Sequence, residues 1–294
     1  LAESLAEDSR FPLAHHQRSD LAQVSQYLGV AQHSTRYPLD ALEEQLRQKI
    51  LTRHEDLLAP EDKDADFAQL AKKVATLRRQ DPQDPYRLVA TLPARVYIDA
   101  SPDALLAQAL IEAGKKPQVM SALWRRDRRP VPPDLDDPTV SRPLVYKILG
   151  RFKDPDSLVL TQDDYFDYLI GASRDSALIP PVVLHALTAQ TLLFLGFQLA
   201  DWSFRVLYRL ILSQDGRAQG RNLRFPHAAV QVEPDGGQIL DLAEARRYLT
   251  EAYGGDAIGL YWGSGEDFLR ELAPRLPQRT PAQWDADDGG DDDD

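Results

Sequence analysis

The segment that decides the fold is IGLYWGSGEDFLRELAPRL, residues 258–276. Its first five residues, Ile258 to Trp262, are rich in β-branched and aromatic side chains and predict a buried strand. The sequence Gly263-Ser-Gly265 turns the chain, and Glu266 to Leu276 is predicted to be a helix. This segment therefore predicts a strand, a glycine turn and a helix in succession.

The same order extends toward the N-terminus. Thr191 to Leu195 predicts a buried strand that ends at Gly196, and it is followed by the helix Ala200 to Leu212. Ala228 to Val232 predicts another strand, and Leu242 to Ala252 another helix. Such alternation implies a parallel sheet with helices on both faces. The predicted fold class is α/β, with a Rossmann-like doubly wound parallel sheet.

Four further strands are expected upstream, at Ala94–Ile98, Lys116–Trp124, Pro143–Leu149 and Ser157–Leu160. Helices are expected at Asp103–Ala113, from the N-cap Thr161 onward, and from Pro181 to about Thr188. The proline-rich stretch Arg125–Arg142 is expected to be an exposed loop.

The first ninety residues show apolar side chains at helical spacing, as in Leu39, Leu42, Leu46 and Ile50. We therefore divide the chain into a helical part that is N-terminal to the sheet domain or inserted into it, the sheet domain, and an acidic disordered tail or linker. Their bounds are 1–92, 93–277 and 278–294.

The composition limits the function. The formal net charge of the 294 residues is −12, and such an acidic surface disfavours nucleic acid as a partner. The chain has no cysteine, so it holds no disulfide, thiolate nucleophile or cysteine-based zinc site, and it fits a reducing cytoplasm. No apolar run reaches membrane-spanning length.

The residues that follow the predicted strands are the candidates for ligand binding, because open parallel sheets bind ligands at the carboxyl ends of their strands. Glycine at these turns lets backbone N–H groups approach a phosphate or a ribose. Taken singly, however, the glycines could be plain turns and Asp201 a helix N-cap, and the Gly263 loop is only a weak anion nest. The candidate cofactor-binding residues are Ser101, Asp103, Gly150, Gly196, Asp201 and Gly263.

Other chemistries find little support in the sequence. The six histidines form no recognisable metal-binding spacing, and we expect no metal. There is no Walker phosphate loop and no nucleophile elbow. The acid pair Asp163-Asp164 lies at a predicted helix start, where carboxylates suit the helix dipole.

Three linked segments carry a family resemblance. They are Pro143-Leu-Val-Tyr-Lys-Ile-Leu-Gly150, Ser157-Leu-Val-Leu-Thr-Gln-Asp-Asp-Tyr165 and Leu192-Leu-Phe-Leu-Gly-Phe-Gln-Leu-Ala-Asp-Trp-Ser-Phe-Arg205. In order and spacing, over about residues 94–275, they resemble the sirtuin-like domains of bacterial antiphage defence proteins. The resemblance implies a Rossmann-type sheet that binds NAD and, in active members, cleaves it to nicotinamide and an ADP-ribose product during infection.

The resemblance also shows what this chain lacks. The family's catalytic histidine falls at Leu149, and its NAD-contacting asparagine falls at Ser101, whereas Asp103, Gly196 and Asp201 are retained. Leucine cannot act as a base, and serine lacks the donor and acceptor pair of an amide. The zinc module of deacetylating sirtuins needs four cysteines, so deacetylation is not expected. The family's glycine-rich phosphate loop should precede the N-terminal helices, so it either lies upstream of Leu1 or is absent.

Two kinds of function follow. The first is an NAD-binding or NAD-hydrolysing effector domain of a multidomain defence protein, with a degenerate catalytic site. The alternative is a catalytically silent scaffold or protein-interaction module that binds no NAD. Expected partners are further domains of the same polypeptide, a partner defence protein or further copies of this chain.

Overall fold

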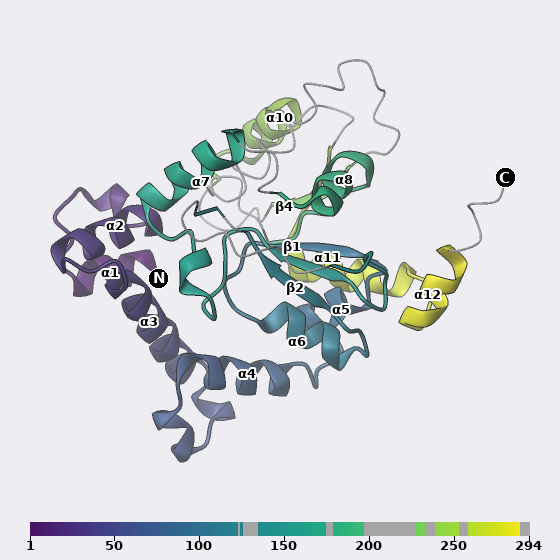
Figure 1. The fold of residues 1–294 in the computed structure, drawn as a ribbon, viewed down its shortest axis with the longest axis horizontal. Helices are drawn as coiled ribbons and strands as arrows, with labels where there is room; N and C mark the ends of the chain where they lie inside the picture. The colour runs from purple at the N-terminus through teal and green to yellow at the C-terminus, as the bar shows by residue number, and fades with distance from the viewer. Residues whose placement is uncertain are drawn as a thin grey trace.

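The computed structural model describes residues 1–122, 124–125, 135–174, 179–196, 227–232, 239–252 and 258–288. In this part, helices surround parallel strands, which confirms the predicted α/β, Rossmann-like class (Figure 1). The predicted helix Ala200–Leu212 lies outside the described residues.

The main sheet has three parallel strands, and β3 lies between β1 and β2. The strands are β1 (Val96–Asp99), β2 (Gln118–Ser121) and β3 (Leu144–Lys147). All four residues of β3 are buried, so this strand is covered on both faces. The strand begins with three consecutive apolar residues, as expected for a central strand of a parallel sheet that is buried on both faces.

The two faces of β3 belong to different cores. Val145 packs in one cluster with Ala90 of α5 (Pro85–Thr91) and with Leu110 of α6 (Leu105–Glu112). On the opposite face, Leu144 and Tyr146 pack in a second cluster with residues of α7 (Gln162–Arg174) and α8 (Pro181–Ala189). Helices therefore cover the sheet on both sides, as predicted.

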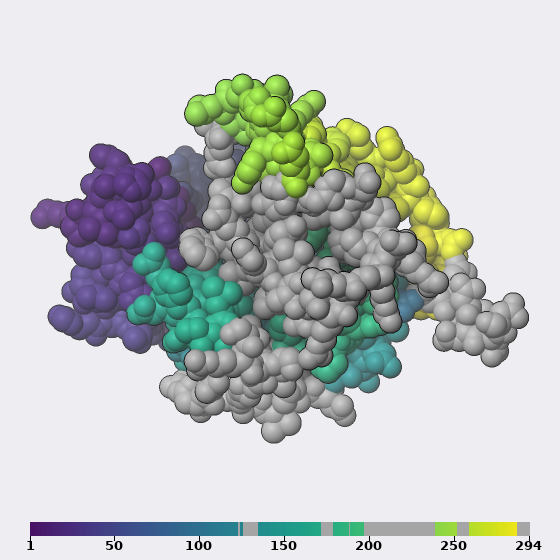
Figure 2. Space-filling view, turned by 90° about the horizontal axis from the view of Figure 1, so that it is seen from above, coloured from purple at the N-terminus to yellow at the C-terminus, as the bar shows by residue number. Residues whose placement is uncertain are grey.

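The N-terminal helices form a separate bundle beside this sheet and gather at the end of the molecule opposite the C-terminal helix (Figure 1, Figure 2). Phe152 and Leu160, which follow β3, pack against the bundle core. Gln26 also donates a 2.7 Å hydrogen bond to Asp163 of α7. The bundle and the helix that extends from it are α1 (Ala2–Asp8), α2 (Leu21–Ala31), α3 (Tyr37–Arg53) and α4 (Phe67–Arg78).

The second strand pair is also parallel, with β4 (His227–Val232) beside β5 (Ile258–Trp262). The helices α10 (Leu242–Ala252) and α11 (Gly265–Leu272) follow the two strands. Leu260 of β5 packs on the same core as Val96 and Ile98 of β1, so the two strand groups share one interior.

Two predicted strands are wrong. At Ser157–Leu160 the structure has the end of a 3-10 turn, Pro155–Ser157, and then irregular chain. Thr191–Leu195 is likewise not a strand; Phe194 is buried in one core, whereas Leu193 and Leu195 pack in another. In both cases the apolar side chains are those of a buried connecting segment. The apolar pattern alone does not distinguish such a segment from a buried strand.

The C-terminal acidic segment also differs from the expectation of disorder, because residues 281–288 form helix α12 (Pro281–Asp288). The Asp285 carboxylate accepts backbone hydrogen bonds from Val140 at 2.6 Å and from Ser141 at 3.1 Å. A single well-placed acid therefore anchors a helix in a stretch whose composition alone predicts disorder.

A buried lysine marks the amino-terminal edge of the sheet. Lys115, with 4% of its surface exposed, donates through Nζ to the carbonyl of Leu92 at 2.7 Å and to the Tyr97 hydroxyl at 3.3 Å. Burial lowers the pKa of Lys115 to about 8, and the Asp285 carboxylate opposes this shift.

The lowered pKa of Lys115 predicts that the free energy of unfolding depends on pH. The unfolded chain keeps a lysine pKa near 10.4, so it binds more protons than the folded chain between about pH 8 and 10.4. Folding should therefore become more favourable as pH rises through this window. In Lys115→Met this contribution disappears, while Tyr97 still donates to Leu92 at 3.2 Å. Urea unfolding of both proteins across the window measures the difference, and parallel curves would contradict the prediction.

Candidate functional site

The loop that follows β1 is held by hydrogen bonds of its own side chains. The Asp99 carboxylate accepts from the Ser101 N–H at 2.8 Å. The Ser101 hydroxyl donates to Asp103 at 2.6 Å, and the other Asp103 oxygen accepts from the Leu105 N–H at 2.8 Å, where α6 begins. Ser101 and Asp103 thus lie together at the carboxyl end of β1 and are both partly exposed.

The loop that follows β3 lies beside the first one. The Phe152 N–H donates to the Pro102 carbonyl at 3.0 Å, which joins the two loops directly. Gly150 has a φ of +81°, and a Cβ at this position would lie 2.2 Å from the Ser157 carbonyl oxygen. The structure therefore brings Ser101, Asp103 and Gly150 to one edge, and Gly150 has a packing role there.

Lys147, the last residue of β3, lies beneath both loops with 1% of its surface exposed. Its Nζ is bonded to the Asp99 carboxylate and to the Asp103 carbonyl, and it donates to the Ser101 carbonyl at 3.0 Å. Burial raises the pKa of Asp99, and the Lys147 ammonium acts against that rise. The ion pair therefore favours the charged form of a carboxylate whose burial disfavours it.

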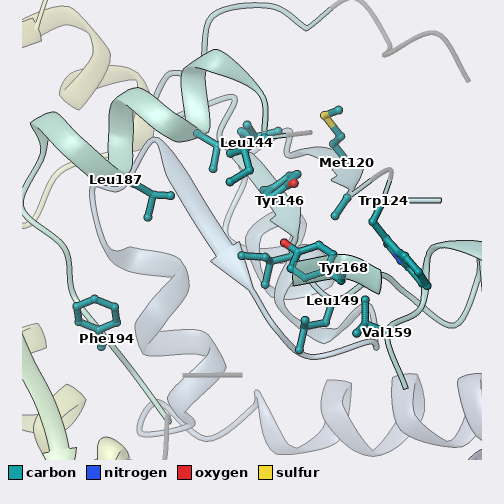
Figure 3. Packing of buried hydrophobic residues seen from close by; sticks show 13 residues of the cluster. Met120, Trp124, Leu144, Tyr146, Leu149, Val159, Tyr168, Leu187 and Phe194 are labelled. Carbon is teal, nitrogen blue, oxygen red and sulfur yellow. The ribbon is translucent and has the colours of Figure 1, made fainter. Parts of the chain in front are cut away.

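Leu149 occupies the position that the resemblance assigns to a catalytic histidine. It has 7% of its surface exposed and belongs to the core cluster that contains Trp124, Val159 and Tyr168 (Figure 3). The Val159 N–H donates to the Leu149 carbonyl at 3.0 Å. The side chain is thus part of the interior and carries no group that can exchange a proton.

An indole and a guanidinium follow β2 on the same edge. Trp124 is buried and donates through Nε1 to the Ser157 carbonyl at 2.8 Å, and the Arg125 guanidinium lies 4.8 Å from its ring centroid. Arg125 also pairs with Asp164 at 3.2 Å. Asp164 closes a capping box with Thr161, which confirms the predicted helix start and gives this acid a structural role.

The remaining predicted site residues are not brought to this edge by any contact that the described residues show. Gly196 has a φ of +72° and is exposed, and Asp201 lies outside the described residues. Gly263 precedes Ser264, whose hydroxyl caps α11 by accepting from Asp267 at 3.0 Å. The carboxylates of Glu266 and Asp267 occupy the first turn of that helix, where a phosphate would have to bind.

Sequence reasoning missed two residues at the edge. Lys147 is the one charge in an otherwise apolar strand, and a buried charge must find partners, so its position was a usable signal. Arg151 follows Gly150, and its buried Nε has no hydrogen-bond partner in the part of the chain that the structure describes. A lone arginine after a strand gives no comparable signal.

This edge offers an acceptor to a ligand. Asp103 retains lone pairs beside its bonds to Ser101 and Leu105, and these can accept further hydrogen bonds. Across the described ranges, no group of three or more His, Asp or Glu side chains could hold a metal ion. None of the helices in those ranges has the length and apolar character that crossing a bilayer requires.

The fold and this edge define a class of protein. A family profile described as "SIR2-like domain" matches residues 95–258, more than half of the chain. The chain therefore belongs to the SIR2-like domain family, which confirms the sirtuin-like resemblance.

A particular relative is the protein named NAD(+) hydrolase ThsA, from Enterococcus faecium. The two are 33% identical over 117 residues, which is 40% of this chain and 22% of the relative. The chain thus spans less than a quarter of the relative's length.

The packing of Gly150 can be tested with a matched glycine. Gly114 also has a positive φ, +82°, but a Cβ there would meet nothing within 4 Å. We expect Gly114→Ala to cost about 1–2 kcal/mol of unfolding free energy from backbone strain alone. Gly150→Ala adds the clash with Ser157 and should cost about 2–5 kcal/mol. Urea denaturation measures both, and equal losses would show that the close approach at Gly150 is unimportant.

Proposed function

We propose that this chain is the NAD-binding, SIR2-like domain of a multidomain bacterial antiphage defence protein, with a degenerate hydrolytic site. The observation that carries the proposal is Leu149, an apolar core side chain at the carboxyl end of β3 where the family has its histidine. The family membership and the NAD hydrolase among its relatives support NAD as the ligand.

Asp103 and Arg151 carry polar groups that suit binding of a nucleotide, whereas Leu149 carries no group that can act as an acid or a base. Asp103 and Arg151 offer an acceptor and a donor for the ribose and phosphate groups of a nucleotide. Cleavage of NAD breaks the bond between the ribose and nicotinamide, and a positioned acid–base group contributes about 10²- to 10⁴-fold to such a step. With leucine at position 149, we expect a protein that binds the nucleotide and turns it over slowly.

A second candidate is a silent scaffold or protein-interaction module that binds no NAD. Two observations favour it. The acids in the first turn of α11 oppose an anion there. On α7, the large apolar side chain of Phe166 is 56% exposed, and exposed apolar side chains of this size can contribute to an interaction surface.

The partners follow from the same proposal. Because the chain matches less than a quarter of its relative, we propose that it works with further domains of the same polypeptide, with a partner defence protein or in a homo-oligomer. A cytoplasmic location fits a domain whose ligand is the cellular NAD pool.

Calorimetry with NAD and ADP-ribose, together with a nicotinamide-release assay, tests the proposed function. We expect saturable binding, slow or undetectable release, and at least about tenfold weaker binding in Asp103→Ala, because a buried ligand hydroxyl loses its charged acceptor. The control is Asp137→Ala, which removes an exposed carboxylate elsewhere. Fast release that Asp103→Ala abolishes would refute the degenerate site, and absence of binding would favour the scaffold.

A further inference from the structure

The hydrogen bonds that the Lys147 ammonium donates all go to one loop. Its ammonium has three protons, and the structure gives it three acceptors: the Asp99 carboxylate and the carbonyls of Ser101 and Asp103. All three acceptors belong to the segment 99–103 that leads from β1 to α6. The lysine comes from the neighbouring strand, so it ties the two strand ends together.

These bonds fix the backbone on either side of the candidate ligand groups. The Ser101 carbonyl and the Asp103 carbonyl are main-chain atoms of the residues whose side chains face the edge. Asp99 itself accepts from the Ser101 N–H at 2.8 Å, so the lysine also orients that turn through its carboxylate partner. Without the ammonium, two partly buried carbonyls would lose a donor and would turn toward water.

We propose that Lys147 is a positioning residue: it holds the 99–105 loop in its ligand-binding conformation and thereby sets the affinity for the nucleotide. This inference rests on the proposed function, since it assigns Ser101 and Asp103 to the nucleotide site. Because Lys147 is fully buried, its ammonium acts through the loop and does not face the solvent side of the edge. When the loop is already ordered, ligand binding does not carry the entropic cost of ordering it, and the affinity is correspondingly higher.

The chain offers a matched control. Lys115 is a second buried lysine that also donates to a main-chain carbonyl, but it precedes β2, at the opposite end of the same parallel sheet. Lys115→Met therefore removes a buried ammonium without touching the 99–105 loop. Any effect that both methionine variants share is a general loss of stability, and any effect confined to Lys147→Met belongs to the loop.

The first measurement is hydrogen exchange of peptides that cover 99–105, made without ligand. We expect faster exchange of the Ser101 and Leu105 amides in Lys147→Met, with unchanged exchange in Lys115→Met. The second measurement is calorimetry with ADP-ribose, in which Lys147→Met should bind about tenfold or more weakly and Lys115→Met as the unchanged protein does.

Chemical rescue separates positioning from packing. The chain has no cysteine, so Lys147→Cys is its only thiol. Alkylation of the denatured variant with bromoethylamine joins its sulfur to an aminoethyl group with loss of bromide, and the refolded product carries an ammonium nearly isosteric with lysine. We expect this product to regain slow exchange and affinity, and the iodoacetamide product, which is neutral, to regain neither. If Lys147→Met does not fold, Lys147→Gln, which is polar but also neutral, takes its place, with the same expected loosening of the loop and loss of affinity.

The outcomes are distinguishable. Loosening of the loop with loss of affinity, both reversed by the aminoethyl group, supports the proposal. An unchanged loop, or a loosened loop with unchanged affinity, overturns it while the proposed function stands. If the unchanged protein binds neither NAD nor ADP-ribose, the proposed function fails, and the positioning role fails with it.

Discussion

The central strand β3 is buried on both faces, and this burial constrains everything around it. Leu144, Val145 and Tyr146 satisfy the constraint with apolar surface, but the strand ends in a lysine that is as buried as they are. Burying an ammonium is costly unless its protons have hydrogen-bond partners. Asp99 at the end of the neighbouring strand and the carbonyls of Ser101 and Asp103 supply them, so the charge that could have destabilised the sheet instead fixes the loop at the carboxyl end of β1.

The same edge shows why single residues are poor guides to function. Gly150 matches a family position, yet its positive φ and the approach of Ser157 to 2.2 Å of a Cβ would require glycine in a protein with no ligand at all. Asp164 resembles half of a catalytic acid pair, but it closes the cap of α7. The proposal for this edge therefore depends on observations taken together, namely the direct bond between the two loops and the family match.

The sequence predicted the parts of the fold in which local pattern and tertiary environment agree. The strand Ile258–Trp262 and the helix Leu242–Ala252 have the predicted bounds, because their apolar side chains repeat with the period of the element they form. It failed where one contact overrides composition. Asp285 docks an acidic helix through two main-chain N–H groups, and Thr191–Leu195 is apolar because it packs between two cores. At the candidate site, the sequence predicted that Ser101 and Asp103 follow a strand, which the structure confirms, but it could not show which acceptors Lys147 contacts.

The two departures from the family pattern have a common physical consequence. Leucine at position 149 continues the core cluster of Trp124 and Tyr168, and serine at position 101 directs its hydroxyl to Asp103 at 2.6 Å. In both cases the side chain finds its partners within the protein itself. Under the proposed function, chemistry that needs a base at position 149 would be lost, whereas binding would need only acceptors and donors with spare capacity. The lone pairs that Asp103 keeps beside its bonds to Ser101 and Leu105 would provide such an acceptor, so the proposed loss of catalysis does not require loss of binding.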